Sequence, residues 1–451
     1  MRVHFIAIGG SAMHNLAIAL KLKGYDISGS DDEIFSPAKD RLSKYGILPK
    51  SMGWYPNKIT KDLDTVILGM HAKEDNPELL RAKELGIKIY SYPEFLYEMS
   101  KDKVRIVVGG SHGKTTTTAM ILHAMQKNNI ETDYMVGALL EGFEVMVKLT
   151  EDAKYIVLEG DEYLTSPIDR RPKFHLYHPN VAIITGVAWD HINVFPTFEN
   201  YCKQFEIFAD KIEKKGTLIY NKEDEEVCRI ALNCRKDVTK LPYHTLPFRI
   251  ENGNTYILHN GKEYLIQVFG EHNLKNMHAA MLVCERIGIT NEDFLFSMQS
   301  FKGASNRLQL IKKNKEVSIF KDFAHSPSKL QATIEAVKEW FPNRRLLACM
   351  ELHTFSSLNK EFLQQYKGCM DKADVAMIYY NRHAIELKRL TDLKKEDIYN
   401  AFQREDLKIY TDKDSVVKEI KKEKMKNLCI LMMSSGNFDG LDFRSFADSL
   451  I

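Results

Sequence analysis

The sequence predicts an α/β protein with three domains, and three observations support this fold class. The chain has 451 residues, more than one hydrophobic core normally holds. Short apolar runs typical of buried strands alternate with longer segments of helical spacing along the whole chain. A glycine-rich turn follows the first apolar run of residues 1–101 and again that of residues 102–302. We therefore expect a Rossmann-like domain at 1–101, a phosphate-loop domain at 102–302 and a second Rossmann-like domain at 303–451, with polar Ser100–Lys103 as the first linker.

The composition argues against nucleic-acid binding, a zinc site and membrane insertion. Hydrophobic residues make up 44% and charged residues 27% of the chain, and the net charge of +2 comes without the basic face that nucleic acid requires. Seven dispersed cysteines without a CxxC pair indicate reduced thiols in a cytoplasm. No apolar run approaches the ~18 residues that a membrane span needs. We expect a cytoplasmic protein that is a monomer or a weak homodimer, without nucleic-acid or membrane partners.

The first domain has the order of elements that opens a Rossmann fold. The predicted elements are a strand at Val3–Ile8, a tight turn at Gly9–Ala12, a helix at Met13–Lys23, a strand at Tyr25–Ser28 and a strand at Thr65–Leu68. Asp31 and His71 follow two of these strands, where ligand loops of open sheets lie. Ala7 and Ala12 replace the outer glycines of the G-x-G-x-x-G fingerprint, so a turn without a ligand is the alternative.

The second domain opens with a phosphate-binding loop. A strand at Val104–Val108 leads into the glycine-rich turn, and a helix is predicted at Thr115–Gln126. Backbone N–H groups of such a turn can approach phosphate oxygens closely, and the helix N-terminus adds partial positive charge. We expect Lys114 to neutralise phosphate charge and Thr115 to bind Mg²⁺. The predicted ATP-binding residues of the loop are Gly110, Ser111, His112, Gly113, Lys114, Thr115 and Thr116.

Carboxylates and a histidine follow later strands of the second domain. Glu159–Glu162 comes after a strand at Tyr155–Leu158, and Gly186–His191 comes after a strand at Val181–Thr185; a further strand is predicted at Leu218–Tyr220. Carboxyl ends of parallel strands meet at the edge where the phosphate loop lies. Alone, Glu159 suits a solvated turn and His191 a structural hydrogen bond, but beside a phosphate loop metal ligation is favoured for both.

The third domain repeats the alternation of strands and helices. Strands are predicted at Ile319–Phe320, Leu346–Met350, Val375–Tyr380 and Leu428–Met433, with helices at Ser328–Trp340, Asn359–Met370 and Ser415–Lys424. This alternation predicts a parallel sheet. Polar clusters again follow the strands, at Asp322–Pro327, His353–Ser356 and Ser434–Asn437.

Six motifs, taken in order, resemble those of one enzyme family. They are Gly110–Thr115 for its GTHGKT loop, Glu159–Glu162 for E-x-D-E, Asp190 and His191 for D-H, Gly270, His272, Asn273 and Asn276 for G-x-H-N-x-x-N, Gly303 and Arg307 for G-x-x-x-R, and Asp322–Pro327 for D-Y-A-H-x-P. The chain thus resembles, over its whole length, the Mur ligase family of ATP-dependent amide ligases in peptidoglycan metabolism.

The resemblance implies ATP and Mg²⁺ as cofactors and assigns roles around the phosphates. Lys114 and Arg307 would contact the transferring phosphoryl group, and one Mg²⁺ would lie on Thr115 and Glu159. A second Mg²⁺ would be held through His191. Lys114, Glu159, His191 and Arg307 are therefore the expected catalytic residues.

The resemblance also implies the remaining nucleotide contacts and the first substrate. Asn276 would face the adenine, while Asp322 and His325 would hold the nucleotide or the reacting centre from a third domain that closes on the second. UDP-N-acetylmuramate would bind the first domain, with its pyrophosphate at Gly9, Gly10, Ser11, Ala12 and Met13 and its uridine near Asp31 and His71.

The second substrate is an amine, and two family activities compete for it. Asp161–Tyr163, Arg170–Phe174 and Met433–Gly440 resemble the recycling ligase, which attaches the tripeptide L-alanyl-γ-D-glutamyl-meso-diaminopimelate. The alternative is the ligase that adds L-alanine, whose P-H-x-Y-S-R motif keeps its histidine here as His353 but has Ser357 in place of arginine. We expect the tripeptide, with His353, Ser357 and Arg382 at its site.

Several details stay open at this point. Gly186 and Ala188 replace an asparagine and a glutamate of the family, which leaves the local metal shell open. The residues do not decide which group is the general base or whether a lysine is carbamylated; the candidates are Glu159, Asp161 and His353 for the base, and Lys203 and Lys211 for the lysine.

Three other protein classes fit parts of the chain. A nicotinamide-dependent oxidoreductase would explain the first turn but has no use for Lys114 and Thr115. An ATP-switch binding module would not need acids at several strand ends. Folate polyglutamate ligases share the central motifs, but the Rossmann-like first hundred residues argue against them.

Overall fold

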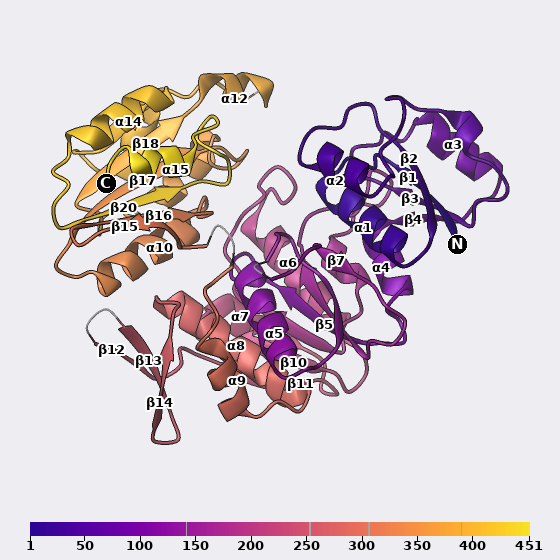
Figure 1. The fold of residues 1–451 in the computed structure, drawn as a ribbon, viewed down its shortest axis with the longest axis horizontal. Helices are drawn as coiled ribbons and strands as arrows, with labels where there is room; N and C mark the ends of the chain where they lie inside the picture. Colours follow the sequence, from indigo (N-terminus) through magenta and orange to yellow (C-terminus); the bar gives the residue numbers. More distant parts are fainter. Residues whose placement is uncertain (141, 252–253, 305–306, 389) are drawn as a thin grey trace. The chain divides into compact units, whose positions relative to one another are not determined.

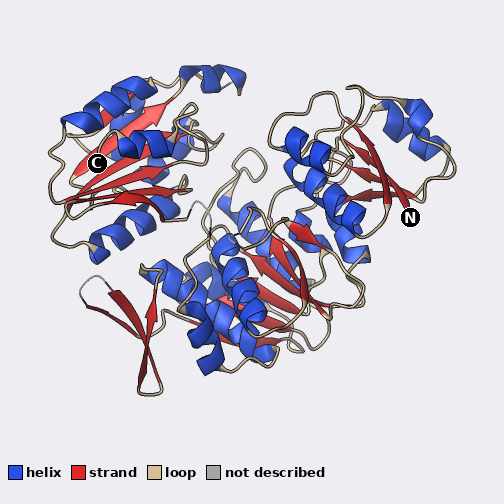
Figure 2. Ribbon diagram, viewed as in Figure 1, coloured by secondary structure: helices blue, strands red, loops and turns tan. Residues whose placement is uncertain are grey.

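The computed structural model describes residues 1–451 except 141, 252–253, 305–306 and 389. Contacts divide the chain into two compact units. The first contains Met1–Val187, Cys202–Tyr243 and Ala279–Asn291, and the second contains Ala188–Tyr201, His244–His278 and Glu292–Ile451. Helices flank the four-stranded, seven-stranded and six-stranded sheets (Figure 2). Among the described residues, no helix has the length and apolar character needed to cross a bilayer.

The first unit begins with a small parallel sheet in the strand order β2-β1-β3-β4 (Figure 1). Its strands are β1 Arg2–Ile6, β2 Asp26–Ser30, β3 Thr65–Leu68 and β4 Ile89–Ser91, and its helices are α1 Ser11–Leu22, α2 Ala38–Lys44, α3 Pro77–Glu84 and α4 Tyr92–Glu98, with a 3₁₀ turn at Pro56–Lys58. Ile6 pairs with both Ser30 and Leu68, so the segments after β1, β2 and β3 leave from one edge of the sheet.

The tight turn predicted at Gly9–Ala12 is wrong in its second half. Helix α1 begins at Ser11, so Ser11, Ala12 and Met13 form its first turn, and the chain bends only at Gly9 and Gly10. Gly10 has the extended backbone of an N-cap, with φ −55° and ψ 145°. Alanine and methionine favour helix, so nothing delays its start.

The rest of the first unit is built on a second, larger sheet in the order β11-β10-β9-β5-β8-β6-β7, parallel except for β7. Its strands are β5 Val104–Gly109, β6 Thr132–Met135, β7 Val147–Lys148, β8 Tyr155–Gly160, β9 Val181–Ile184, β10 Thr217–Asn221 and β11 Thr239–Tyr243. The associated helices are α5 Lys114–Lys127 and α7 Glu225–Asn233, together with α6 Phe198–Asp210 and α8 Glu271–Arg286, whose first turns belong to the second unit, and a 3₁₀ turn at Lys173–Leu176. The predicted strands of this domain are confirmed, but β8 continues through Glu159 and Gly160.

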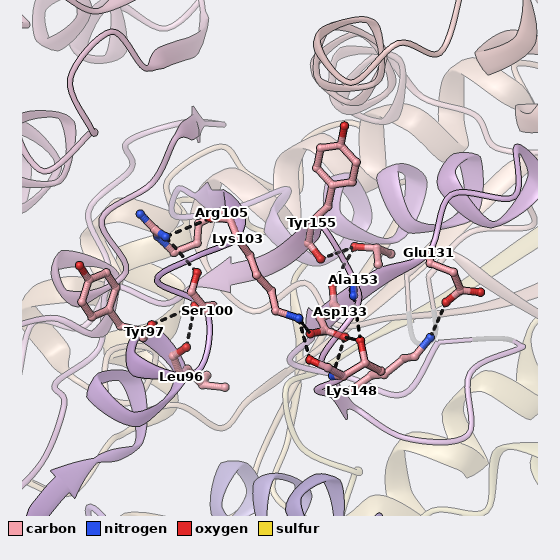
Figure 3. A network of polar contacts seen from close by, with 12 residues as sticks. Leu96, Tyr97, Ser100, Lys103, Arg105, Glu131, Asp133, Lys148, Ala153 and Tyr155 are labelled. Carbon is pink, nitrogen blue, oxygen red and sulfur yellow. Dashed lines mark hydrogen bonds and ion pairs between the residues drawn. The ribbon is translucent and has the colours of Figure 1, made fainter. Parts of the chain in front are cut away.

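The segment Ser100–Lys103, predicted as a linker, is packed and anchored. The guanidinium of Arg105 donates to the carbonyl oxygens of Ser100 and Lys103 at 2.9 and 3.0 Å (Figure 3), and to that of Lys101 at 2.7 Å. Lys103 Nζ donates to Asp133 Oδ2 at 2.6 Å. Because Ser100, Arg105 and Asp133 are buried, these polar groups depend on one another for hydrogen bonds. These hydrogen bonds anchor the segment Ser100–Lys103 to Arg105 on β5 and to Asp133 on β6.

The second unit contains a six-stranded sheet in the order β15-β16-β20-β17-β18-β19, parallel except for the edge strand β15. Its strands are β15 Gln309–Lys313, β16 Val317–Asp322, β17 Arg345–Leu352, β18 Val375–Tyr380, β19 Lys408–Tyr410 and β20 Leu428–Met433. Its helices are α9 Asn291–Met298, α10 Pro327–Trp340, α11 Lys360–Leu363, α12 Arg382–Leu387, α13 Lys395–Phe402, α14 Lys413–Lys422 and α15 Phe443–Asp448. A separate antiparallel sheet contains β12 Phe248–Glu251, β13 Asn254–His259 and β14 Lys262–Ile266.

The predicted parallel sheet of the third domain is confirmed for five of its strands. Apolar clusters cover both faces of this sheet, which explains why its strands are continuous apolar runs. The helix predicted at Asn359–Met370 is too long. Helix α11 ends at Leu363 and a 3₁₀ turn at Gln364–Tyr366 follows, because the chain reverses at Gly368, where φ is 74°.

Candidate nucleotide and substrate sites

The phosphate loop connects β5 to α5 and requires glycine at two positions. Gly113 has φ 79° and forms the N-cap of α5. Gly110 has φ 138°, and a Cβ there would overlap the hydroxyl of Thr185 at the end of β9. These glycines turn the backbone directly into the helix N-terminus, which is the geometry for binding phosphate.

Lys114 is held inside the loop by an acid from the segment after β8. Its Nζ donates to the Gly110 carbonyl at 2.6 Å and lies 2.7 Å from Glu162 Oε2. Burial alone would lower the pKa of Lys114, but the charges of Glu162 and Asp161 outweigh it and raise this pKa. The loop therefore contains a charged lysine whose ammonium group is already oriented.

Thr115 and Glu159 form the oxygen-donor pair expected for Mg²⁺. The Thr115 hydroxyl donates to Glu159 Oε1 at 2.6 Å, and the backbone N–H of Gly137, after β6, donates to Glu159 Oε2 at 2.7 Å. Burial raises the pKa of Glu159, with Asp161 adding to the effect. A hydroxyl and a carboxylate are ligands that Mg²⁺ prefers, so these residues fit the ion. No sequence pattern indicated Gly137, which reaches Glu159 through the pairing of β6 with β8.

The glycine at position 186 has a local structural reason. A Cβ on Gly186 would lie 2.5 Å from His112 Nε2. The Gly186 carbonyl also accepts hydrogen bonds from the Ser111 N–H and hydroxyl, both at 2.9 Å. Glycine replaces the family asparagine where the His112 ring fills the space. Thr116, like Ser111, is buried beside this loop.

The segment after β8 folds back on itself beside the phosphate loop. The N–H of Lys173 donates to the Tyr163 carbonyl at 2.9 Å, and Lys173 Nζ lies 3.2 Å from Asp161 Oδ2. Asp161 is thus paired with a lysine, whereas Glu159 accepts hydrogen bonds from two neutral donors, Thr115 and Gly137. The acids of the predicted segment Glu159–Glu162 therefore lie close to Lys114 in the first unit.

In the second unit, the predicted D-H pair lies beside the predicted histidine of the third domain. Asp190 Oδ2 is 3.7 Å from Lys329 Nζ and 3.9 Å from His325 Nε2. His325 Nδ1 donates to the Phe323 carbonyl at 2.7 Å, and burial and Lys329 lower the pKa of His325 to about 3. His191 has φ 56° and donates its backbone N–H to Asp190 Oδ1 at 2.8 Å. Metal binding by His191 stays a prediction.

Asp322 and Arg307 also lie in the second unit. Asp322 Oδ2 accepts the N–H of Leu308 and Oδ1 that of Ala324, both at 2.6 Å. The buried carboxylate thus shapes the backbone around Arg307, and its predicted nucleotide contact stays a prediction. Arg307 stacks over the Phe323 ring, with 4.8 Å between guanidinium carbon and ring centroid, and within the described residues no ion pair engages it.

The predicted adenine residue Asn276 lies on the first half of α8 and is buried. Gly270 precedes this helix with φ 86°, where a Cβ would lie 3.0 Å from the His272 ring. Burial lowers the pKa of His272 to about 4, with Lys275 and Arg307 contributing. The motif thus forms a turn and a helix start, and the adenine contact stays a prediction.

Predicted amine-site residues gather at one edge of the six-stranded sheet. Leu352 pairs with Tyr380 and Met350 with Met433, so the segments after β17, β18 and β20 leave from the same edge. His353 is half-buried there, and Arg382 is exposed at the start of α12. Ser357 is fully buried, and its N–H donates to Thr354 Oγ1 at 3.0 Å. Ser357 therefore holds a turn and offers no charge to a substrate.

Glu351, a buried acid near the end of β17, was not identified from the sequence. Its carboxylate accepts the Phe438 N–H at 2.9 Å and a hydrogen bond from the Ser434 hydroxyl. One signal was available, since an acid inside the apolar run from 346 to 352 must find partners when the strand is buried.

The predicted sugar-nucleotide residues gather at the edge of the first sheet. Asp31 accepts the Gly9 N–H at 2.7 Å and the Asp32 N–H at 3.0 Å. Burial raises the pKa of Asp31 to about 6, although the hydrogen bond from Gly9 acts against it. His71 is exposed after β3, and Gly10 leads into Ser11 at the start of α1. The edge is compatible with the predicted ligand, whose binding stays a prediction.

Three family descriptions match the chain in succession. They are "Mur ligase family, catalytic domain" at residues 2–104, "Mur ligase middle domain" at 108–284 and "Mur ligase, glutamate ligase domain" at 306–436. A UDP-N-acetylmuramate–L-alanine ligase of a Sulfurihydrogenibium species is 31% identical over 384 residues, covering 84% of this chain and 82% of its own length.

Two solved structures have the same fold. The UDP-N-acetylmuramate-alanine ligase of Thermotoga maritima is 21% identical, with a TM-score of 0.72 over 100% of this chain and 99% of its own. A murein peptide ligase of Psychrobacter arcticus is 22% identical, with a TM-score of 0.67 over 100% and 98%. From the three successive matches and the Sulfurihydrogenibium relative, which matches over 82% of its own length, the chain belongs to the Mur ligase family, whose members are ATP-dependent ligases that form amide bonds.

Proposed function

We propose that this chain joins the lactyl carboxylate of UDP-N-acetylmuramate to the amine of L-alanine, with Mg²⁺ and ATP, in peptidoglycan synthesis. The observation that supports it most is the phosphate loop, where oriented Lys114 lies beside the oxygen-donor pair of Thr115 and Glu159. A loop of this kind suits a reaction that brings a carboxylate up to a triphosphate, because neutralising negative charge is then the main requirement.

The proposed reaction has two steps. A carboxylate oxygen of the substrate attacks the γ-phosphorus of ATP; the new O–P bond forms as the bond to the β-phosphate oxygen breaks, and ADP leaves. The neutral amine nitrogen then attacks the carbonyl carbon of this acyl phosphate. The C–N bond forms, the C–O bond to phosphate breaks, and the nitrogen gives up a proton as phosphate leaves.

Residues of the first unit have defined roles in the first step. Lys114 would donate to the β- and γ-phosphate oxygens in exchange for its bond to the Gly110 carbonyl. Thr115 and Glu159 would bind Mg²⁺, which supplies positive charge on the phosphates. The raised pKa of Glu159 reflects its burial and the charge of Asp161, and a bound cation would favour the ionised form.

Residues of the second unit are candidates for the transferring phosphate and the second step. Arg307, which is stacked on Phe323 without an ion pair in the described part of the chain, would contact the phosphoryl group. His353 is a candidate base because its ring is partly exposed at the sheet edge. His191, Asn276, Asp322 and His325 keep the roles predicted from the sequence.

The choice of L-alanine rests on the 31% identical relative of the Sulfurihydrogenibium species, whose name specifies L-alanine and not the tripeptide. This favours the alternative considered in the sequence analysis over its main prediction. One observation keeps the tripeptide as a second candidate. Ser357 stands where an arginine would bind the carboxylate of free alanine, and its side chain is buried in a turn with Thr354.

A competition experiment distinguishes the two amines. Phosphate release is measured with UDP-N-acetylmuramate, ATP and Mg²⁺, with L-alanine or the tripeptide varied, and kcat/KM is compared. We expect a higher kcat/KM with L-alanine. A preference for the tripeptide would replace L-alanine by the second candidate, and no release with either amine would overturn the proposed function.

A further inference from the structure

Glu351 is a buried acid at the carboxyl end of β17 that the proposed reaction does not use. It is 3% exposed, and it lies two residues before His353. A buried carboxylate is costly unless donors surround it. Its partners therefore indicate what this acid does in the fold.

Two donors converge on one oxygen of Glu351 from the segment after β20. The Ser434 hydroxyl and the Phe438 N–H, at 2.9 Å, both donate to Oε2. The Ser434 hydroxyl oxygen in turn accepts the Gly436 N–H at 2.6 Å. The segment from 434 to 438 is thus wrapped around a single carboxylate oxygen.

The other oxygen faces the side chain at the amine edge. Glu351 Oε1 lies 3.8 Å from His353 Nδ1. A Cβ on Gly436 would lie 2.9 Å from both Glu351 Oε2 and the His353 ring, so only glycine lets the segment approach this closely. Glu351 therefore contacts two segments of the edge, one after β17 and one after β20.

We propose that Glu351 is a positioning residue for the incoming amine. It fixes the 434–438 segment against His353 and so shapes the amine-binding edge of the six-stranded sheet. The inference rests on the proposed function, because it requires the amine to bind at this edge. Glu351 itself is too buried to contact the substrate and acts through His353 and the backbone of Gly436.

The physical basis is the cost of leaving buried donors without an acceptor. Replacing Glu351 by alanine removes the acceptor of Ser434 and Phe438, and the segment must move to find water. Glutamine keeps a side-chain oxygen that can accept both donors, so it preserves the segment although the charge is lost. Comparing the two variants therefore separates the effect of losing the hydrogen-bond acceptor from the effect of losing the charge.

The test measures the KM for each of the three substrates in wild type, Glu351→Ala and Glu351→Gln. We expect Glu351→Ala to raise the KM for the amine by about tenfold or more, as for the loss of buried hydrogen bonds, with the KM for ATP and UDP-N-acetylmuramate unchanged. Glu351→Gln should restore most of the amine affinity. An unchanged amine KM in Glu351→Ala, or an equal rise for all three substrates, would overturn the proposal.

An exposed acid at the opposite end of the same strands, Asp374, controls for general destabilisation. Asp374 accepts the Leu346 N–H at 2.7 Å and pairs with Lys338 at 2.5 Å, before β18 begins. Asp374→Asn should lower the Tm without changing the amine KM. If it raises the amine KM as Glu351→Ala does, the effect is general and the proposal fails. Absence of activity in the wild type would instead count against the proposed function, so the two failures are distinguishable.

Discussion

The hydroxyl of Thr115 donates a 2.6 Å hydrogen bond to Glu159, joining the first turn of α5 to the end of β8. The phosphate loop connects β5 to α5, and the acids lie at the end of β8 and after it. In the pairing of β5 with β8, Gly109 lies opposite Gly160. The bond therefore marks where a divalent cation would lie between two rigid elements. Exchange of this hydrogen bond for metal ligation is the local change that the proposed reaction requires.

Lys114→Ala should lower kcat by on the order of 10²-fold or more, because a preoriented cation at the phosphates is lost. The assay is phosphate release at saturating substrates. Lys103→Ala is the matched control, since Lys103 forms a 2.6 Å pair with buried Asp133 on the same sheet, away from the loop. The control should lose stability and keep kcat. A Lys114→Ala enzyme with near wild-type turnover would contradict the role of the loop.

Glu159→Ala and His191→Ala should each raise the Mg²⁺ concentration that gives half-maximal activity. Glu159 is the oxygen donor paired with Thr115, and His191 is the predicted second ligand. The measurement is a Mg²⁺ titration of phosphate release at fixed ATP. Identical titrations for wild type and Glu159→Ala would return Glu159 to a purely structural role, and the same holds independently for His191.

Gly186→Asn should weaken ATP binding, because the new side chain would displace the His112 ring from its contact with residue 186. We expect a raised KM for ATP, with the KM for the amine unchanged. Gly46→Asn serves as control, since no atom lies within 4 Å of a Cβ there and asparagine tolerates its φ of 68°. An unchanged KM for ATP in Gly186→Asn would show that the His112 contact is dispensable.

His175 should make the protein less stable in acid. Burial lowers its pKa from 6.5 to about 4, and its Nε2 donates to the Gln204 carbonyl at 2.7 Å. The unfolded chain therefore binds more protons between these pH values, and stability falls as pH drops from 6.5 towards about 4. His175→Gln should reduce that fall by roughly 3 kcal/mol, measured by denaturant unfolding at several pH values. Exposed His71→Gln should not, and an undiminished fall in His175→Gln would contradict the assignment.

Sequence patterns were sufficient for the parts of the fold that are built locally. Continuous apolar runs predicted β3, β18 and β20 with their observed bounds, because strands buried on both faces have no polar positions to blur their ends. The strand–glycine–lysine–helix order predicted the phosphate loop, because this loop is formed by consecutive residues of the chain. Short edge strands such as β7 and β15, and the sheet of β12 to β14, were missed because they lack such runs.

Contacts between distant segments could not be predicted. The hydrogen bonds from the backbone N–H groups of Leu308 and Ala324 to the carboxylate of Asp322 had no signal in the sequence, while its nucleotide contact stays a prediction. Glu351 was overlooked because its partners lie more than eighty residues away, in the segment after β20. The contacts of a polar side chain at the edge of a sheet depend on how the strands pair. A single sequence does not specify that pairing.

The central claim is that ATP activates a substrate carboxylate as an acyl phosphate, and transfer of an oxygen isotope tests it most directly. UDP-N-acetylmuramate labelled with ¹⁸O in its lactyl carboxylate is converted with ATP, Mg²⁺ and the preferred amine, and the released phosphate is analysed by mass spectrometry. We predict one ¹⁸O in each phosphate, because the attacking oxygen leaves with the phosphorus, and one labelled oxygen in the amide. Unlabelled phosphate formed together with amide would contradict the claim.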